Sequence, residues 1–182
     1  MSSGPSLDDI RVAARRIAPF IHRTPVLTCA TLDAMASARL YFKCENFQKT
    51  GSFKIRGAAN AVLQLSPAEA ARGVVTQSSG NHAAAVAKAA SARGIAAHIV
   101  MPKNAPAVKC KAVESYGGVI TFCEPTVEAR DAKMKQLLEE TGGVLVHPYN
   151  DRRVIAGQGT AALELLEGKV LPGIAALPDK QT

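Results

Sequence analysis

The sequence lacks tryptophan altogether, and its aromatic residues amount to only 4% of 182 positions. A core poor in aromatic rings must be filled by smaller side chains, and the abundant alanine, glycine and valine suit helices packed closely on a sheet. With 47% hydrophobic and 20% charged residues, the chain has ample apolar surface to bury, which excludes a disordered protein. Its length allows one core or two small lobes.

The sequence also lacks segments that direct a chain into or across a membrane. No apolar run is long enough to span a bilayer. The first residues, MSSGPSLDDIRVAARR, contain no apolar core of a secretory signal, and the acidic Asp8 and Asp9 argue against an organelle transit peptide. We therefore expect a cytoplasmic protein.

Cysteine and clustered basic charge are scarce as well. Cys29, Cys44, Cys110 and Cys123 have neither CxxC spacing nor a histidine at ligand spacing, so we expect reduced, buried thiols and no metal site. The net charge is +7, but the 22 Lys and Arg residues are scattered, without a basic run or interleaved aromatics. This pattern argues against nucleic-acid binding.

What the sequence does contain is a regular alternation of strand-like and helix-like segments. Strands are expected over 73–77, 95–102, 119–124 and 144–150, with helices over 81–93, 106–116, 127–140 and 157–167. Upstream, we expect helices over 6–19 and 52–65, a short helix from about residue 31 and a strand over 40–47. Short links between such elements predict an α/β fold, an open parallel sheet with helices on both faces. Ligands of such sheets bind beyond the carboxyl ends of the strands.

The stretch KTGSFKIRG (49–57) places a lysine where a helix begins. If Ser52 caps the helix, Lys54 lies in its first turn, where the helix dipole disfavours an ammonium group. A nearby Arg56 and burial beside Phe53 would also lower the lysine pKa. A neutral amine is what a Schiff-base lysine requires, although on position alone a surface lysine is the more common explanation.

A second candidate site is QSSGNHAAA (77–85), which directly follows a predicted strand and opens a helix. Ser78, Ser79 and Asn81 would bring hydroxyl, amide and backbone N–H groups to one point, which suits a carboxylate or a phosphate. An ordinary helix cap explains the same residues. His82 alone is a weak signal.

Two further features are ambiguous on their own. Arg130 could reach a carboxylate, or it could lie on a solvated helix face. The segment GQGT (157–160) opens a predicted helix with a glycine pair, which is a weak phosphate signal and fits tight packing or a turn equally well.

Taken together, five segments resemble a known family. They are KTGSFKIRGA (49–58), SSGNHAAA (78–85), ESYGG (114–118), CEP…EAR (123–130) and HPYNDRRVIAGQGTAALELLE (147–167). In order and spacing they resemble the fold-type II pyridoxal-phosphate enzymes, most closely serine racemases and serine/threonine dehydratases. The resemblance extends from about Ile10 to Glu167.

The resemblance implies a role for each matching residue. Lys54 would form the aldimine with pyridoxal 5′-phosphate and take the Cα proton on one face, with Phe53 packed beside the ring. Asn81 would hydrogen-bond the 3′-oxygen of the cofactor. The substrate carboxylate would be held by Ser78, Ser79, Asn81 and His82, with Arg130 closing over it.

Ser79 separates the two activities of the family. Racemases of this family have a serine there as the acid/base on the opposite face, while dedicated threonine dehydratases often have alanine. The resemblance therefore implies a serine racemase and dehydratase that acts on L-serine, D-serine and L-threonine, as a homodimer. A threonine/serine ammonia-lyase without racemisation is the alternative.

The resemblance also implies possible effectors. An ATP effector would lie near Cys29, Ala30, Thr31, Lys49, Thr50 and Tyr116, although Ala84 replaces an expected glutamine. Tyr149 stands where some relatives place an asparagine near the cofactor. A divalent cation, Mg²⁺ or Ca²⁺, belongs to the complete enzymes, but its ligands have no counterpart here.

The resemblance fades after Glu167, where GKVLPGIAALPDKQT (168–182) has no regular period and is expected to be disordered. The family's SGGG-type phosphate loop and the serine that bonds the pyridine nitrogen have no counterpart. We thus expect a truncated large domain (1–70, resumed at 149–167) and a complete small domain (73–148). Such a chain would bind the cofactor weakly and be inactive alone, or would act as a non-catalytic fragment docked on a full-length subunit.

Overall fold

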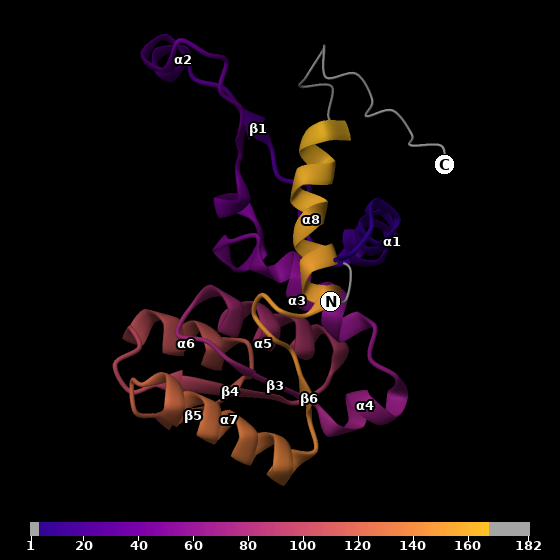
Figure 1. Cartoon of the computed structure of the whole chain (residues 1–182), viewed down its shortest axis with the longest axis vertical. Helices are drawn as coiled ribbons and strands as arrows, with labels where there is room; N and C mark the ends of the chain where they lie inside the picture. Colours follow the sequence, from indigo (N-terminus) through magenta and orange to yellow (C-terminus); the bar gives the residue numbers. More distant parts are fainter. Residues whose placement is uncertain (1–3, 168–182) are drawn as a thin grey trace.

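The structure is a computed structural model and describes residues 4–167 (Figure 1). Its helices are α1 (Leu7–Ile17), α2 (Ala30–Ala36), α3 (Lys54–Leu63), α4 (Pro67–Arg72), α5 (Asn81–Arg93), α6 (Ala107–Ser115), α7 (Val127–Thr141) and α8 (Arg152–Glu167). Its strands are β1 (Val26–Leu27), β2 (Phe42–Lys43), β3 (Val74–Gln77), β4 (Ala97–Pro102), β5 (Val119–Cys123) and β6 (Val144–Leu145). The short 3₁₀ helices are η1 (Ala18–Phe20), η2 (Glu45–Phe47) and η3 (Lys49–Gly51).

The central sheet confirms the predicted fold class. Its four strands run parallel in the order β5-β4-β3-β6. Helices α5 and α6 cover one face and α7 covers the other (Figure 1). Because side chains alternate along a strand, Val74 and Ile99 join the core under α5, while Val75 and Val100 join a second core with Leu137 of α7. We call β3–β6 with α5–α7 the sheet region.

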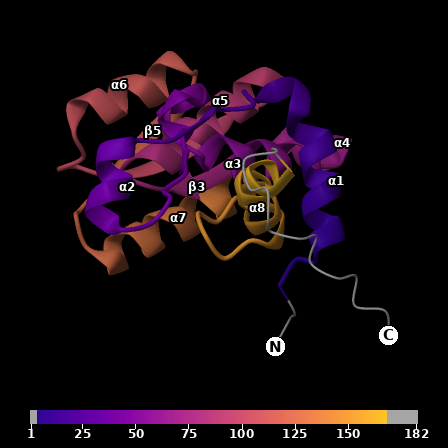
Figure 2. The same cartoon turned by 90° about the horizontal axis from the view of Figure 1, so that it is seen from above.

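A second group of elements lies on the outer side of α5. Helices α1, α3 and α8 pack against one another, and α3 also packs on α5 (Figure 2). The antiparallel pair β1–β2 forms a hairpin that carries α2 away from the rest of the chain (Figure 1). We call α1, α3, α8 and this hairpin the three-helix region.

Helices α3 and α8 cross at glycines. A Cβ atom on Gly157 would lie 2.5 Å from the carbonyl oxygen of Arg56 and 2.6 Å from the Cα of Gly57. A Cβ atom on Gly57 would lie 2.8 Å from the carbonyl oxygen of Val154. Only glycine permits this approach, so of the two explanations for GQGT, tight packing is the one observed.

Several predicted boundaries were wrong. The strand predicted over 40–47 is reduced to β2 and followed by η2, because the Glu45 side chain turns inward to an ion pair with Arg56. The strand predicted over 144–150 ends at Leu145. Pro148 has no N–H to donate, and the backbone N–H groups of Tyr149 and Asn150 donate to the ring of His147 instead of to a strand.

Helix boundaries also differ from expectation. Helix α8 begins at Arg152 and not near Gly157, because a carboxylate oxygen of Asp151 accepts the backbone N–H of Arg153 at 2.8 Å. The glycine pair therefore lies inside this helix. The sequence analysis did not predict helix α4, which begins with a capping box between Ser66 and Glu69.

Two expectations are not tested by the described residues. The disordered tail predicted over 168–182 lies outside the described residues. The division into domain segments remains a prediction. No helix within residues 4–167 is both long and apolar enough to cross a membrane.

Candidate active site

Lys54 opens helix α3 beside the segment that follows β6. Its Nζ donates to the carbonyl oxygen of Pro148 at 3.1 Å and lies 5.3 Å from the centroid of the Phe53 ring. No ion pair within residues 4–167 includes this lysine. Burial of the half-exposed side chain lowers the pKa of Lys54, as the sequence predicted. The site therefore offers an amine with a reduced cost of losing its proton.

The expected cap of this helix was wrong. Phe53 occupies the N-cap position, and no side chain hydrogen-bonds there. Ser52 is extended and buried, and its hydroxyl has no hydrogen-bond partner in the described part of the chain. The helix start is thus left uncapped, with free backbone N–H groups near Lys54.

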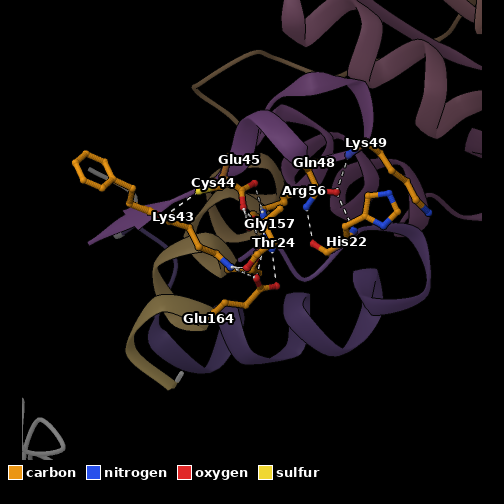
Figure 3. A network of polar contacts seen from close by, with 12 residues as sticks. His22, Thr24, Lys43, Cys44, Glu45, Gln48, Lys49, Arg56, Gly157 and Glu164 are labelled. Atoms are coloured by element: carbon orange, nitrogen blue, oxygen red, sulfur yellow. Dashed lines mark hydrogen bonds and ion pairs between the residues drawn. The ribbon is translucent and has the colours of Figure 1, made fainter. Parts of the chain in front are cut away.

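The expected influence of Arg56 on Lys54 was also wrong. Burial alone lowers the pKa of Lys54, and the guanidinium of Arg56 is fully buried and paired with two carboxylates (Figure 3). It donates to Glu45 at 2.7 and 2.8 Å and to Glu164 at 2.7 and 2.9 Å. Lys43 also donates to Glu164 at 2.7 Å. Local sequence could not reveal this network, since Glu164 is 108 residues from Arg56.

The network shifts the pKa values of the groups that form it. Burial alone would raise the pKa of Glu45 and Glu164, but the hydrogen bonds from Arg56 and its neighbours, together with the charges of Arg56 and Lys43, outweigh burial and hold both pKa values below the ordinary range. Burial would lower the pKa of Arg56, and the two carboxylates raise it instead. All three groups therefore stay charged inside the protein at neutral pH.

The turn after β3 lies where the sequence placed it. Ser78 donates its backbone N–H to Val100 at 3.1 Å, and its hydroxyl accepts the N–H of Gly80 at 3.2 Å. Ser79 is exposed. Gly80 is the N-cap of α5 and has no side chain to occupy the first N–H groups of that helix. Asn81, also exposed, accepts a hydrogen bond on Oδ1 from Lys109 Nζ at 2.6 Å.

His82 points into the core and away from this exposed turn. Its Nε2 lies 3.1 Å from the carbonyl oxygen of Val146, which also accepts the hydroxyl of Thr76 at 2.7 Å. Since a carbonyl only accepts, Nε2 carries the proton, and the buried Nδ1 has no partner among the described residues. Burial lowers the pKa of His82 to about 4, so the ring is neutral at pH 7. What His82 offers an anion is its backbone N–H, in the first turn of α5.

Arg130 lies near the start of α7 on the opposite face of the sheet, half-buried. Its neighbour Asp131 accepts a hydrogen bond from Gln77, the last residue of β3, at 2.9 Å. The start of α7 is thus beside the turn, but within residues 4–167 no hydrogen bond joins the Arg130 guanidinium to Ser78 or Asn81.

The residues expected near an ATP effector fall into two groups. Cys29, Ala30 and Thr31 are at the start of α2, on the projecting hairpin, while Tyr116 ends α6 (Figure 1). In the described part of the chain no hydrogen bond or ion pair joins the two groups. Lys88 lies 5.2 Å from the centroid of the Tyr116 ring, and it shares a groove with Lys49.

Sequence reasoning missed two contacts at the site. The carbonyl of Pro148 and the ammonium of Lys109 contact Lys54 and Asn81, and both come from segments distant in sequence. The signal for Lys109 was its place in the first turn of a predicted helix beyond a strand end. No group of three or more histidine, cysteine, aspartate or glutamate side chains within residues 4–167 is arranged to hold a metal ion.

Comparison with known proteins agrees with this geometry. Residues 17–176 match a family described as pyridoxal-phosphate dependent enzyme. The chain is 55% identical over 161 residues to a serine racemase of Oryza sativa subsp. indica, and the match covers 88% of this chain and 48% of that protein. It therefore spans about half the length of the curated relatives it matches.

Solved structures give the same result. A maize serine racemase is 54% identical, with a TM-score of 0.89 over 91% of this chain and 50% of its own. A threonine deaminase of T.th. is 48% identical, with a TM-score of 0.83 over 89% of this chain and 51% of its own.

Proposed function

Because this chain belongs to the family of pyridoxal-phosphate dependent enzymes, we propose that its protein racemises and dehydrates L-serine. The observation that carries the proposal is the amine of Lys54, which has a lowered pKa, no carboxylate partner within residues 4–167, and a position close enough to His82, in the first turn of α5, for its charge to lower the pKa of that histidine. The likeness to serine racemases and to a threonine deaminase supports the substrate class.

The residues present fit pyridoxal 5′-phosphate. An aldehyde needs an amine that readily loses its proton, and Lys54 supplies one. An aromatic ring needs an apolar neighbour, and the ring of Phe53, which is 41% exposed, lies beside the amine. The buried hydroxyl of Ser52, next to Phe53 in sequence, lacks a partner in the described residues and is available to a polar group of a ligand.

When bound, the cofactor supplies an electron-withdrawing ring that acidifies the Cα–H of an amino acid attached to it. In our proposal Lys54 Nζ removes and returns this proton on one face. Its hydrogen bond to Pro148 fixes the direction of the amine, and burial keeps a neutral fraction available.

The turn after β3 would hold the substrate carboxylate. Ser78 and Asn81 offer a hydroxyl and an amide, and the uncapped start of α5 offers backbone N–H groups, among them that of His82. We propose Ser79 as the acid/base on the opposite face, because its hydroxyl is exposed and makes no hydrogen bond within residues 4–167. We assign Arg130 to closure over the carboxylate.

The second candidate function is a threonine/serine ammonia-lyase without racemisation. The likeness to a threonine deaminase favours it. The two differ at Ser79, since racemisation requires proton delivery from both faces, whereas loss of the β-hydroxyl requires only removal of the Cα proton. Substituting Ser79→Ala should abolish D-serine formation and retain pyruvate formation, and equal loss of both products would remove the role proposed for Ser79.

The decisive experiment titrates pyridoxal 5′-phosphate into the purified 182-residue chain and follows the visible absorbance band. Borohydride reduction and peptide mass mapping then locate the adduct. A saturable band with the adduct on Lys54 and its loss in Lys54→Ala support the proposal. Adducts scattered over many lysines, with no saturable band, would contradict it for this chain. Assays with L-serine, D-serine and L-threonine follow.

Other features complete the proposal. We propose a homodimer in the cytoplasm, where the four free cysteines would remain reduced. For a complete enzyme of this family we also propose dependence on ATP, through Lys49, Thr50 and Tyr116, and on Mg²⁺ or Ca²⁺. Docking of this chain on a full-length subunit is the non-catalytic alternative, and co-purification with such a subunit is its test.

A further inference from the structure

Lys109 contacts the candidate site from a neighbouring helix. It is the third residue of α6, which begins beyond the end of β4, while α5 begins beyond the end of the adjacent strand β3. The two helix starts are therefore neighbours, and the half-buried Lys109 bridges them through its 2.6 Å hydrogen bond to Asn81 Oδ1.

The position of Lys109 has no electrostatic explanation within its own helix. The first turn of α6 contains no acidic residue, and a cation there opposes the helix dipole. No salt bridge within residues 4–167 includes Lys109. The Asn81 oxygen is thus the contact that holds this ammonium group in place.

The contact determines which way the Asn81 amide faces. An ammonium group only donates hydrogen bonds, so the atom that faces Lys109 must be the amide oxygen. The two N–H donors of Asn81 Nδ2 then face elsewhere, on an exposed residue, and have no acceptor among residues 4–167. Without Lys109 the amide could rotate by half a turn and present its oxygen, which repels a carboxylate.

We propose that Lys109 is a positioning residue that holds the Asn81 amide with its N–H donors toward the acceptor oxygen of a ligand. This inference rests on the proposed function, which places a substrate carboxylate or the cofactor's 3′-oxygen at Asn81. Lys109 itself acts through Asn81 and need not touch the ligand.

The first test needs no cofactor and uses the ¹⁵N-labelled 182-residue chain. The side-chain amide resonances of Asn81, assigned by their loss in Asn81→Ala, should move in Lys109→Met and stay near their original position in Lys109→Arg. Lys111→Met is the matched control, because Lys111 is exposed on the same helix and has no hydrogen bond or ion pair within residues 4–167. Unmoved Asn81 resonances in Lys109→Met would overturn the proposal.

The second test asks whether the orientation matters for binding. L-serine is titrated into each variant and followed at the backbone amides of Ser79 and Gly80. Loss of a hydrogen bond to a charged group predicts a dissociation constant about tenfold higher in Lys109→Met. Asn81→Ala should weaken binding to a similar extent, and the double variant should be no weaker than Asn81→Ala alone.

Three results of these titrations would contradict the proposed role of Lys109. Additive effects in the double variant, an unchanged dissociation constant, or no response of the original chain to L-serine would overturn the positioning role. Failure of the proposed function shows separately, as absence of a pyridoxal-phosphate adduct on Lys54, since the L-serine titration contains no cofactor.

Discussion

The sheet region and the three-helix region are stabilised in different ways. In the sheet region the buried residues are almost all aliphatic, as in the cluster of Val75, Val100, Cys123 and Leu137. In the three-helix region the junction of α3, α8 and the hairpin encloses a fully buried arginine with two glutamates and a lysine. Aliphatic burial depends on volume and tolerates small changes, whereas a buried ion network depends on every partner being present.

The regions also contribute different parts of the candidate site. The three-helix region supplies Lys54, and the sheet region supplies the turn Ser78–Asn81 and the carbonyl of Pro148 just beyond β6. The amine and the turn Ser78–Asn81 therefore keep their relative positions only while α3 stays packed on α5. Selective loss of the ion network should disturb the amine before the turn.

The largest expected effect comes from removing the central cation. Arg56→Met leaves Glu45 and Glu164 buried with one lysine between them, and loss of one partner of a buried network costs about 3–5 kcal/mol of the free energy of unfolding. Urea denaturation measures the loss. Arg39→Met, which alters an exposed loop arginine, is the control and should change stability by less than about 0.5 kcal/mol.

Hydrogen exchange on the same variant would show where the loss falls. Faster exchange in α3 and α8 with unchanged protection in β3 and β4 is expected, because the network lies outside the sheet region. A uniform loss over both regions would mean that they unfold as one unit, and the contrast between them would disappear.

Acid should affect the two regions through different residues. His82 in the sheet region has its pKa lowered to about 4 by burial, below the unfolded value near 6.5. The unfolded chain therefore binds a proton that the folded chain excludes, and stability falls as pH decreases from about 6.5 to 4, by about 3 kcal/mol in total. His82→Gln, which keeps a donor for Val146, should flatten the stability profile in this window.

The glutamates of the three-helix region respond at lower pH. Their pKa values are lowered, so their contribution is present above the unfolded value near 4.5 and is lost as pH falls below it through the folded values. A stability profile of His82→Gln that still falls steeply between pH 6.5 and about 4.5 would contradict the assignment of that window to His82.

The same contrast explains what the sequence could predict. Elements of the sheet region depend on local patterns, and helix α5 was predicted at its observed bounds from the Asn81 start and the Gly94 stop. The position of the turn Ser78–Asn81 followed from the predicted strand before it and the predicted helix after it, and its binding of an anion remains a prediction. The length of strand β2 was overestimated, and Ser52 was wrongly expected to cap α3. The role of Arg56 was misjudged because its ion-pair partner Glu164 lies far along the chain.

The smallest expected effect concerns the contact between α3 and α8. Gly157→Ala would place a methyl group 2.5 Å from a backbone oxygen of α3, which cannot move aside as a side chain could. Overpacking of about 1–3 kcal/mol, less the gain of about 1 kcal/mol from alanine in a helix, predicts a net loss of up to about 2 kcal/mol. Urea denaturation again measures the change.

Gly159→Ala is the matched control, since it lies on the same helix and meets only the flexible end of Ile10, at 2.8 Å. It should be neutral or stabilising by up to about 1 kcal/mol, because the Ile10 side chain can rotate while the helix still gains alanine propensity. If both substitutions stabilise the chain equally, the glycine contact does not fix the spacing of α3 and α8. The position of Lys54 would then depend on the Arg56 network and on α5, without a contribution from the helix crossing.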